Sequence, residues 1–280
     1  MTVVVVTDSA ARIPAPLRAR WGIEQVPLHI LADGEDLRDG VDDIPADLLE
    51  RSQISTAAAT PEELRIAYRR AYAASGGDGV VAVHLSAELS GTVGAAWAAA
   101  GEIGDAVRVV DSRSAGMGAG FAALAAARAA ADGADLATVV TAAAAAAERG
   151  RAYLVVQRLD SLRRSGRIGG ASAWLGTALS LKPLLRIDNG KLVLAQRIRT
   201  AGKALAAMVD RVCEAVGDEP AGLAVHHVTD PDGAAELAAT VGERLPQCPP
   251  PIVTDLGPVL GLHVGPGALA VCVDPAAPQG

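Results

Sequence analysis

The chain has 280 residues, of which half are hydrophobic and 20% are charged, and its formal net charge is −7. This length is enough for two domains of ordinary size. An acidic chain lacks the basic field that general nucleic-acid binding needs, so the composition argues against nucleic acid as a partner.

The hydrophobic residues form no segment that is long enough to cross a membrane. The longest apolar stretch, residues 115–127, ends at Arg128, whereas a spanning helix needs about 20 residues. Residues 1–6 contain no basic region and leave no room for a signal-peptide core before Asp8. We therefore expect a soluble, cytoplasmic protein. Phe121 is the single phenylalanine, so any apolar pocket must be lined mainly by aliphatic side chains.

The first half of the chain alternates between predicted strands and helices. Three β-branched runs, residues 3–6, 80–85 and 107–110, are typical of strands buried on both faces. Helices are expected from about Ser90 and again in the Ala-rich segment after Ser112. Such alternation indicates a parallel sheet, in which ligands lie beyond the carboxyl ends of the strands. The polar residues at those ends are Thr7-Asp8-Ser9, Ser86 and Asp111-Ser112.

Two further helices can be placed by their capping residues. Thr60-Pro61-Glu62-Glu63 has the pattern of a capping box with proline in the first turn. Asp135 is placed to cap a helix that runs through Ala147 and stops at Gly150. We take Gly150 as the domain boundary, which gives an N-terminal domain of residues 1–150 and a C-terminal domain of residues 151–280.

The second half predicts an α/β domain with a mixed sheet. A strand is expected at residues 152–156, and Asp188-Asn189-Gly190 is a hairpin turn between residues 183–187 and 191–196. A helix from about Ala201, a strand at 223–227, a helix at 233–244 and a strand at 269–273 follow. The predicted fold class is α/β with two domains, a mostly parallel N-terminal sheet and a mixed C-terminal one.

The segment His84–Thr92 joins a predicted strand to a helix and carries hydroxyl side chains. Ser90 and Thr92, flanking Gly91, lie where the free N–H groups of the helix point outward. One interpretation is an ordinary N-cap. The other is an anion site at the positive end of the helix dipole.

Thr56 belongs to a second hydroxyl-bearing stretch, residues 55–60. Capping explains Thr60, but Thr56 has no such local role, so it either faces a ligand or lies in a plain loop.

A glycine-rich turn at residues 262–268 contains His263, and a lone histidine in a loop is usually structural. His226 and His227 are adjacent on a predicted strand, so they point to opposite faces and cannot chelate one metal ion together. Cys213, Cys248 and Cys272 are far apart and are expected to be buried structural thiols. No metal site is predicted.

Residues 163–170 form a basic, glycine-rich loop in an acidic protein. The loop is either a solvated connection or a contact for phosphate or for an acidic partner, since arginine suits phosphate and exposed N–H groups can hold an anion. Arg197 and Arg199 add to the same group of candidates from the predicted hairpin strand.

Several enzyme signatures are missing from the sequence. It contains neither a G-x-x-x-x-G-K-[ST] phosphate loop nor a G-x-S-x-G elbow. Residues 116–120 imitate a dinucleotide fingerprint, but Phe121 replaces its third glycine and no strand directly precedes it.

Taken in chain order, these motifs resemble the DegV family of bacterial fatty-acid-binding proteins over nearly the whole chain. They are Thr7-Asp8-Ser9, Leu89-Ser90-Gly91-Thr92, Asp111-Ser112, the L-x-x-L-x-x-G-G-R-I-like stretch 159–168, Arg197-Ile198-Arg199 and His263-Val264-Gly265-Pro266-Gly267.

The resemblance implies a long-chain fatty acid held between two α/β domains, with no cofactor and no catalytic residue of the chain's own. By resemblance, Thr56, Ser90 and His263 bind its carboxylate, and Ser86, Thr92, Gly91, Asp8 and Ser9 lie close to it. A separate ATP-dependent fatty acid kinase would phosphorylate the acid for phospholipid synthesis. Gly166, Arg167 and Arg199 would contact that kinase or phosphate, and a transient encounter with a membrane or an acyltransferase is compatible with this role.

The chain departs from the family pattern in two places. The family's T-S-Q-P-S stretch is Thr56-Ala57-Ala58-Ala59-Thr60 here, so its central polar residues are missing, and Ser165 replaces the first glycine of G-G-R. Two other functions stay open. One is a lipid hydrolase or acyltransferase with Ser90 as nucleophile, His263 as base and Asp8 or Asp111 as its partner. The other is a lipid-sensing regulator or a binder of a different apolar acid.

Overall fold

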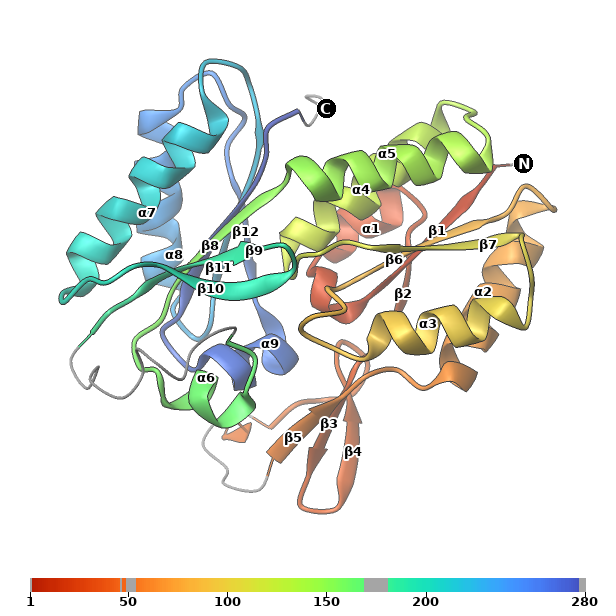
Figure 1. The fold of residues 1–280 in the computed structure, drawn as a ribbon, viewed down its shortest axis with the longest axis horizontal. Helices are drawn as coiled ribbons and strands as arrows, with labels where there is room; N and C mark the ends of the chain where they lie inside the picture. Colours follow the sequence, from red (N-terminus) through yellow and green to blue (C-terminus); the bar gives the residue numbers. More distant parts are fainter. Residues whose placement is uncertain (1, 46, 49–53, 169–180, 277–280) are drawn as a thin grey trace. The chain divides into compact units, whose positions relative to one another are not determined.

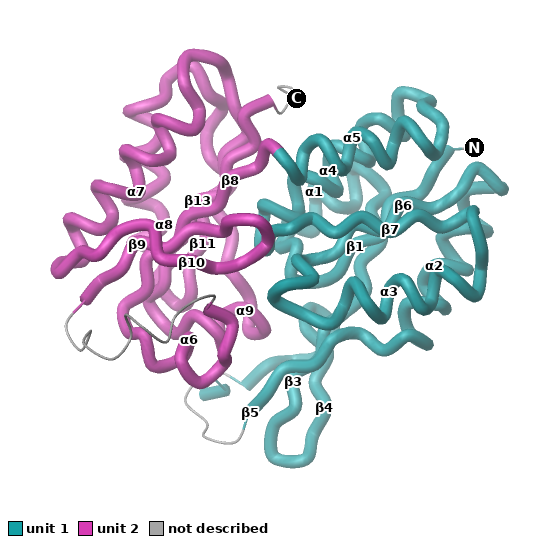
Figure 2. The backbone as a smooth tube through the Cα atoms, in the orientation of Figure 1, with its two compact units in different colours: residues 1–148 teal, residues 149–280 magenta. Residues whose placement is uncertain are grey.

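The computed structural model describes residues 2–45, 47–48, 54–168 and 181–276 and contains two compact units (Figures 1 and 2). Unit 1 is Met1–Glu148 and unit 2 is Arg149–Gly280. The division lies two residues before Gly150.

Unit 1 is built on a parallel sheet of four strands in the order β2-β1-β6-β7. The strands are β1 (Val4–Asp8), β2 (Glu24–Val26), β6 (Val80–His84) and β7 (Val107–Asp111). All five residues of β6 are buried, as expected for a central strand covered on both faces. The predicted parallel sheet is therefore confirmed.

Helices cover both faces of this sheet, with α2 and α3 on one side and α4 on the other (Figure 1). The helices of unit 1 are η1 (Ser9–Ala11), α1 (Ala15–Arg20), α2 (Pro61–Ser75), α3 (Thr92–Gly101), α4 (Met117–Ala131) and α5 (Leu136–Arg149). Both predicted caps are confirmed: Thr60 and Glu63 form a capping box, and the Asp135 carboxylate accepts a hydrogen bond from Thr138 N–H at 2.8 Å.

The glycines that imitate a dinucleotide fingerprint have a packing role. A Cβ atom on Gly120 would lie 2.8 Å from the Ala11 carbonyl oxygen and 2.8 Å from Met117 Sδ. Only glycine permits this approach of α4 to η1.

A small antiparallel sheet, in the order β4-β3-β5, also belongs to unit 1 and was not predicted. Its strands are β3 (His29–Ala32), β4 (Glu35–Arg38) and β5 (Ile54–Ala57). Residues 54–57 therefore form an edge strand, so the plain-loop interpretation of Thr56 is wrong.

Unit 2 contains a mixed sheet in the order β10-β9-β8-β13-β11-β12, in which β11 and β12 form the parallel pair. Its strands are β8 (Arg151–Val155), β9 (Leu184–Asp188), β10 (Lys191–Gln196), β11 (Gly222–His227), β12 (Ile252–Asp255) and β13 (Leu269–Asp274). The predicted hairpin is confirmed: Asn189 and Gly190, both at positive φ, connect β9 and β10.

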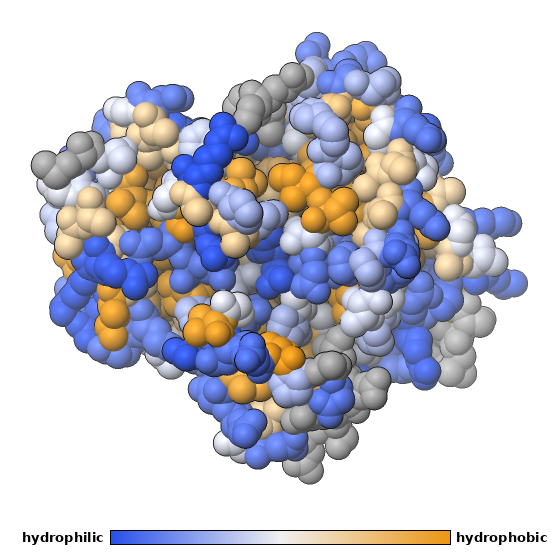
Figure 3. Space-filling model, turned by 180° about the vertical axis from the view of Figure 1, so that it is seen from behind, coloured by the Kyte–Doolittle hydropathy of each residue, from blue (hydrophilic) through white to orange (hydrophobic). Residues whose placement is uncertain are grey.

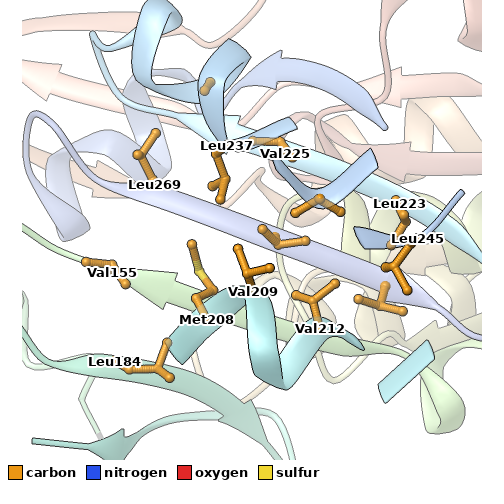
Figure 4. Packing of buried hydrophobic residues seen from close by; sticks show 14 of the residues in the cluster. Val155, Leu184, Met208, Val209, Val212, Leu223, Val225, Leu237, Leu245 and Leu269 are labelled. Carbon is orange, nitrogen blue, oxygen red and sulfur yellow. The ribbon is translucent and has the colours of Figure 1, made fainter. Parts of the chain in front are cut away.

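The helices of unit 2 are α6 (Asp160–Ser165), α7 (Ala201–Val216), α8 (Pro231–Arg244) and α9 (Gly257–Val264). Helices α7 and α8 bury their apolar faces against the sheet (Figure 4). The labelled core contains Met208, Val209 and Val212 from α7 and Leu237 from α8, with Leu184 and Val225 from the strands. Such aliphatic packing supplies the main stabilisation of this unit.

The surface mixes polar and apolar residues on the face shown in Figure 3. The large apolar side chains exposed in the described residues are Leu31, Val41, Ile66, Trp97 and Val253. Cys272 is buried and Cys213 and Cys248 are half-buried, all three as free thiols. In the described part of the chain, no helix combines the length and the apolar character that a membrane span requires.

Candidate functional site

The carboxyl ends of the parallel strands in unit 1 bring several of the predicted site residues together. The register pairs His84 with Asp111, and Ser112 N–H donates to the His84 carbonyl oxygen at 3.0 Å. Ser86 N–H donates to the Ser114 carbonyl oxygen at 2.8 Å. The turns after β1, β6 and β7 therefore meet at one edge of the sheet, as the alternating pattern predicts.

Asp8 lies at the centre of this edge and is fully buried. Its Oδ1 accepts from Ala10 N–H at 3.0 Å, and its Oδ2 accepts from Leu85 N–H at 2.9 Å and lies 3.0 Å from His84 Nδ1. A carboxylate with these three partners holds the start of the 85–92 turn in place. Asp8 thus stabilises the start of the turn through buried hydrogen bonds.

His84 and Tyr68 extend this network into the interior. The Tyr68 hydroxyl lies 2.7 Å from His84 Nε2, and both side chains are buried. Burial, together with the negative charge of Asp8, raises the pKa of the Tyr68 phenol, so the phenol stays protonated and can donate to the imidazole. Neither His84 nor Tyr68 was recognised as a site residue, because residues 16 positions apart show no pattern that predicts this pairing.

Ser9 is also buried, and its hydroxyl accepts a hydrogen bond from Leu28 N–H at 3.1 Å. This bond ties the end of β1 to the segment before β3. Both Asp8 and Ser9 therefore have structural partners, and their closeness to a ligand stays a prediction.

The turn from Ser86 to Thr92 is ordered by its own polar groups. Ser86 Oγ accepts from Glu88 N–H at 3.2 Å, and the Ser86 carbonyl oxygen accepts from Ser90 N–H at 3.1 Å. Asp111 Oδ1 accepts from Ala87 N–H at 3.3 Å, which ties the turn to the end of β7. The conformation of the turn therefore depends mainly on local hydrogen bonds.

Ser90 ends this turn beside the start of α3. Its Oγ lies 2.9 Å from Thr92 Oγ1 and accepts from Thr92 N–H at 3.3 Å. Helix α3 begins at Thr92 after Gly91, but the Ser90 hydroxyl accepts the Thr92 N–H as a capping side chain does, so the N-cap and anion-site interpretations both stay open. Ser90 is half-buried and Thr92 is buried. The Ser90 hydroxyl, with the buried Thr92 hydroxyl beside it, lies at the positive end of a ten-residue helix, where an anion is favoured.

Thr56 lies on β5, opposite Ile30 of β3 in the antiparallel register, and is half-buried. Four residues later, Thr60 begins α2. Thr56 is thus held between a strand pairing on one side and a helix cap on the other.

In unit 2, His263 lies near the end of α9, so its predicted place in the glycine-rich turn is wrong. The turn itself begins at Gly265, whose φ of 85° favours glycine, and a Cβ there would lie 3.0 Å from Ser161 Oγ of α6. This close approach packs the end of α9 against α6. The glycine pattern predicted the turn, but it could not show that the residues before it are helical.

The positive charge of Arg167 acts on His263. Burial lowers the pKa of the His263 imidazole, and the positive charge of Arg167 adds to this effect, giving a value of about 4. His263 is therefore neutral near pH 7, with one nitrogen as a donor and the other as an acceptor. A neutral imidazole can donate to a carboxylate without adding a fixed cation.

Arg167 follows α6, where Gly166 adopts a φ of 66° and ends the helix. Gly166 and Arg167 are exposed, and the Arg167 guanidinium donates to the Ser165 carbonyl oxygen at 2.5 Å. Ile168 forms a bridge with Leu192, which anchors the loop to the hairpin. The last two residues of the predicted basic loop, 169–170, lie outside the described residues.

Arg199 is exposed and lies between β10 and α7, since β10 ends at Gln196. Its predicted place on the hairpin strand is therefore wrong. The neighbouring Ile198 carbonyl oxygen accepts from Lys182 N–H at 2.8 Å, which fixes the chain just before Arg199.

The predicted residues thus divide between the units. In unit 1, Thr56 lies on the smaller sheet. The other predicted residues of unit 1 lie at the strand ends: Asp8, Ser9, Ser86, Ser90, Gly91 and Thr92. Unit 2 contains Gly166, Arg167, Arg199 and His263. Within the described ranges, no cluster of three or more His, Cys, Asp or Glu residues could hold a metal ion.

This combination of a parallel N-terminal sheet and a mixed C-terminal sheet defines a class of two-domain α/β proteins. The model of the DegV family, described as uncharacterised proteins, matches residues 2–276. A DegV domain-containing protein of Mycobacterium tuberculosis is 65% identical over 274 residues, which cover 98% of each chain. The chain belongs to the DegV family.

Solved structures of the family have the same fold. A DegV family protein from Thermus thermophilus, described by its fatty acid binding, has a TM-score of 0.92 at 31% identity, covering 98% of this chain and 99% of that one. DegV from Bacillus subtilis, described as a fatty acid binding protein, has a TM-score of 0.87 at 29% identity with the same coverage. The predicted family and fold class are therefore confirmed.

Proposed function

We propose that this chain binds a long-chain fatty acid and has no catalytic activity of its own. The observation that carries the proposal is the hydroxyl pair of Ser90 and Thr92 at the start of α3, in a fold shared with fatty-acid-binding relatives. Thr56, Ser90 and His263 are the proposed ligands of the carboxylate, and the acid is the only bound group that the proposal requires.

The free energy of transfer supports a hydrocarbon ligand. Each buried methylene contributes about 0.8 kcal/mol, so some fourteen give roughly 11 kcal/mol before the costs of association and ordering. A desolvated carboxylate without partners costs several kcal/mol, so the head group needs donors. Hydroxyl groups, a helix N-terminus and a neutral imidazole supply them.

The same donors leave the carboxylate reactive. A guanidinium in direct contact would stabilise the ionised acid strongly and occupy both of its oxygens. The hydroxyls of Thr56 and Ser90 hold the acid more weakly, which leaves an oxygen available to a second protein. We propose that this protein is an ATP-dependent fatty acid kinase and that the acyl-phosphate it forms enters phospholipid synthesis in the cytoplasm.

The exposed Gly166 and Arg167, and the exposed Arg199, are the proposed contacts with that kinase or with phosphate. Arginine suits this role because its planar guanidinium pairs with phosphate oxygens. A transient encounter with a membrane or an acyltransferase would follow the transfer.

The competing proposal, a hydrolase with Ser90 as nucleophile, has little geometric support. Among the described residues of unit 1, the hydrogen-bond partner of the Ser90 hydroxyl is Thr92, and no histidine of that unit bonds to it. The Asp8 carboxylate is already paired with His84, whose other nitrogen contacts Tyr68. An activated serine needs a base within hydrogen-bonding reach.

Mass spectrometry of the lipid that co-purifies with the protein from its own host tests the proposal directly. A long-chain fatty acid is expected at close to one per chain, and a preparation free of fatty acid would contradict it. Ser90→Ala should weaken palmitate binding about tenfold, as loss of a hydrogen bond to a charged group does. Arg167→Ala serves as the matched control, because it should spare palmitate binding and impair phosphorylation by the kinase.

A further inference from the structure

His29 is a buried histidine with an acidic partner at each ring nitrogen. It lies on β3 and is 6% exposed. Its Nδ1 lies 2.7 Å from Asp36 Oδ1 of β4, and its Nε2 lies 3.0 Å from Glu63 Oε2 of α2. Carboxylates accept hydrogen bonds, so two such contacts require a proton on both nitrogens, which only the imidazolium has.

Within the described residues, the charged groups near His29 come from β4, from the segment after it and from α2. Asp36 and Glu63 bond to it directly, and Asp42 lies close enough for its pKa to respond to the charge of His29. Arg38 lies opposite His29 in the register, but its guanidinium donates to both oxygens of Asp42. Three carboxylates thus face one guanidinium when His29 is neutral, and protonation of His29 reduces this excess of negative charge.

Glu63 connects His29 to the beginning of α2. The same Oε2 atom accepts from Thr60 N–H at 2.8 Å and from the Thr60 hydroxyl at 2.7 Å. The capping box and the histidine therefore share one carboxylate oxygen. The cap of α2 and the position of His29 are linked through Glu63.

The segment that precedes α2 carries Thr56. Ala57 pairs with His29 and Thr56 pairs with Ile30 in the β3–β5 register. A path of contacts therefore leads from His29 on β3 to Glu63 and from Glu63 to Thr60. Residues 57–59 connect Thr60 back to Thr56. These contacts connect β5 to His29 in two ways, through the pairing with β3 and through the cap of α2.

We propose that His29 is a positioning residue for Thr56, so that its protonated form holds β5 in the geometry that binds a fatty-acid carboxylate. The inference rests on the proposed function. When His29 loses its proton, one ring nitrogen presents a lone pair to a carboxylate, and the contact becomes repulsive. A smaller fraction of molecules then has β5 in place, which lowers the apparent affinity in proportion.

The electrostatics agree with the geometry. Burial lowers the pKa of His29, but the hydrogen bonds and charges of Asp36 and Glu63 outweigh it, so the pKa is raised above 6.5. The pKa of Glu63 is lowered, because its bonds with Thr60 and His29 outweigh the opposite effect of burial. Binding should therefore be strongest below about pH 6.5 and should decline as the pH rises through the raised pKa.

Palmitate binding by the full chain, measured by calorimetry from pH 6 to pH 9, tests this inference. His29→Gln should weaken binding about fivefold at pH 6 and abolish its decline at higher pH, since glutamine carries no charge. Asp36→Asn should give a smaller loss in the same direction, and it replaces a side chain that is 57% exposed, so it provides a second variant that leaves the core intact. Glu35→Gln, on the exposed side of β4, is the matched control and should retain the wild-type profile.

The protection of the β5 amides against hydrogen exchange provides an independent readout. Protection factors of Ile54–Ala57 should fall with rising pH in the wild type and should be low at every pH in His29→Gln. A wild-type pH profile in both His29→Gln and Asp36→Asn would overturn the inference.

Thr56→Ala separates this inference from the proposed function. If Thr56→Ala weakens binding at pH 6 and His29→Gln does not, only the positioning role fails. If the wild type fails to bind palmitate at every pH, the proposed function fails and the inference fails with it.

Discussion

The two hydroxyls proposed to bind the carboxylate from unit 1 are held in different ways. Ser90 ends a turn whose hydrogen bonds run mostly to backbone N–H groups, with the buried carboxylate of Asp8 behind it. Thr56 lies on an edge strand that pairs with the strand of His29, whose ring contacts the carboxylates of Asp36 and Glu63. The comparison teaches that backbone hydrogen bonds surround the first proposed ligand, whereas ionisable side chains surround the strand of the second.

The stability of the protein should be most sensitive to loss of Asp8, the central side chain behind the turn that ends at Ser90. Asp8→Ala removes the partner of His84 Nδ1 and of two buried N–H groups, at an expected cost of about 3–5 kcal/mol in the free energy of unfolding. Urea denaturation measures this cost. Asp105→Ala, whose side chain is 93% exposed, is the control and should change stability by less than about 0.5 kcal/mol.

A milder change removes only the Tyr68 hydroxyl from the network of Asp8, His84 and Tyr68. Tyr68→Phe deletes the hydroxyl that contacts His84 Nε2 and should cost about 1–2 kcal/mol, because the imidazole nitrogen is left buried without its partner. Tyr72→Phe on the same helix is the control, since Tyr72 is half-buried. Equal stability of the two variants would show that the buried hydrogen bond contributes nothing.

Near β5, the cap of helix α2 can be removed without substituting His29. Thr60→Ala should cost about 1 kcal/mol, which is typical for loss of an N-cap. It should also lower the amide protection of β5, because Thr60 and His29 share Glu63 Oε2. Unchanged amide protection of β5 would show that the helix cap does not stabilise this strand.

The smallest expected effect is the pH dependence of stability that His29 confers. Its pKa is raised in the folded state, so the stabilisation is fully present below about pH 6.5 and is lost as the pH rises through the raised pKa. The loss should be less than about 1 kcal/mol, since Asp36 is 57% exposed and solvent screens its charge. Thermal unfolding of the wild type and of His29→Gln at pH 6 and pH 9 should converge at the higher pH.

The fold was largely predictable because its signals are local. The β-branched runs at residues 3–6 and 80–85 predicted the two central strands, which are covered on both faces, and the run at 107–110 predicted β7, which lies at the edge of the sheet and exposes Arg108. Thr60, Asp135 and the Asn189-Gly190 turn were located by hydrogen bonding or backbone geometry that neighbouring residues determine.

The short elements were missed or misplaced. Residues 29–57 contain three strands of four residues each, too short for their alternation to be distinctive, and β4 is mostly exposed. Helix α9 is rich in glycine and includes proline, which disfavour a helix by propensity alone, so His263 was assigned to a turn. Packing against α6 stabilises this helix in spite of its sequence.

For the candidate site, the sequence determined which hydroxyl and cationic residues were available and that the strand ends of unit 1 would lie together, because the order of strands and helices imposes a parallel sheet. Only the tertiary structure decided that Asp8 bonds to His84 instead of an exposed group, and that His29 lies between two carboxylates. The physical reason is that these contacts join residues that are distant in the chain, and their strength depends on burial, which no local pattern reveals.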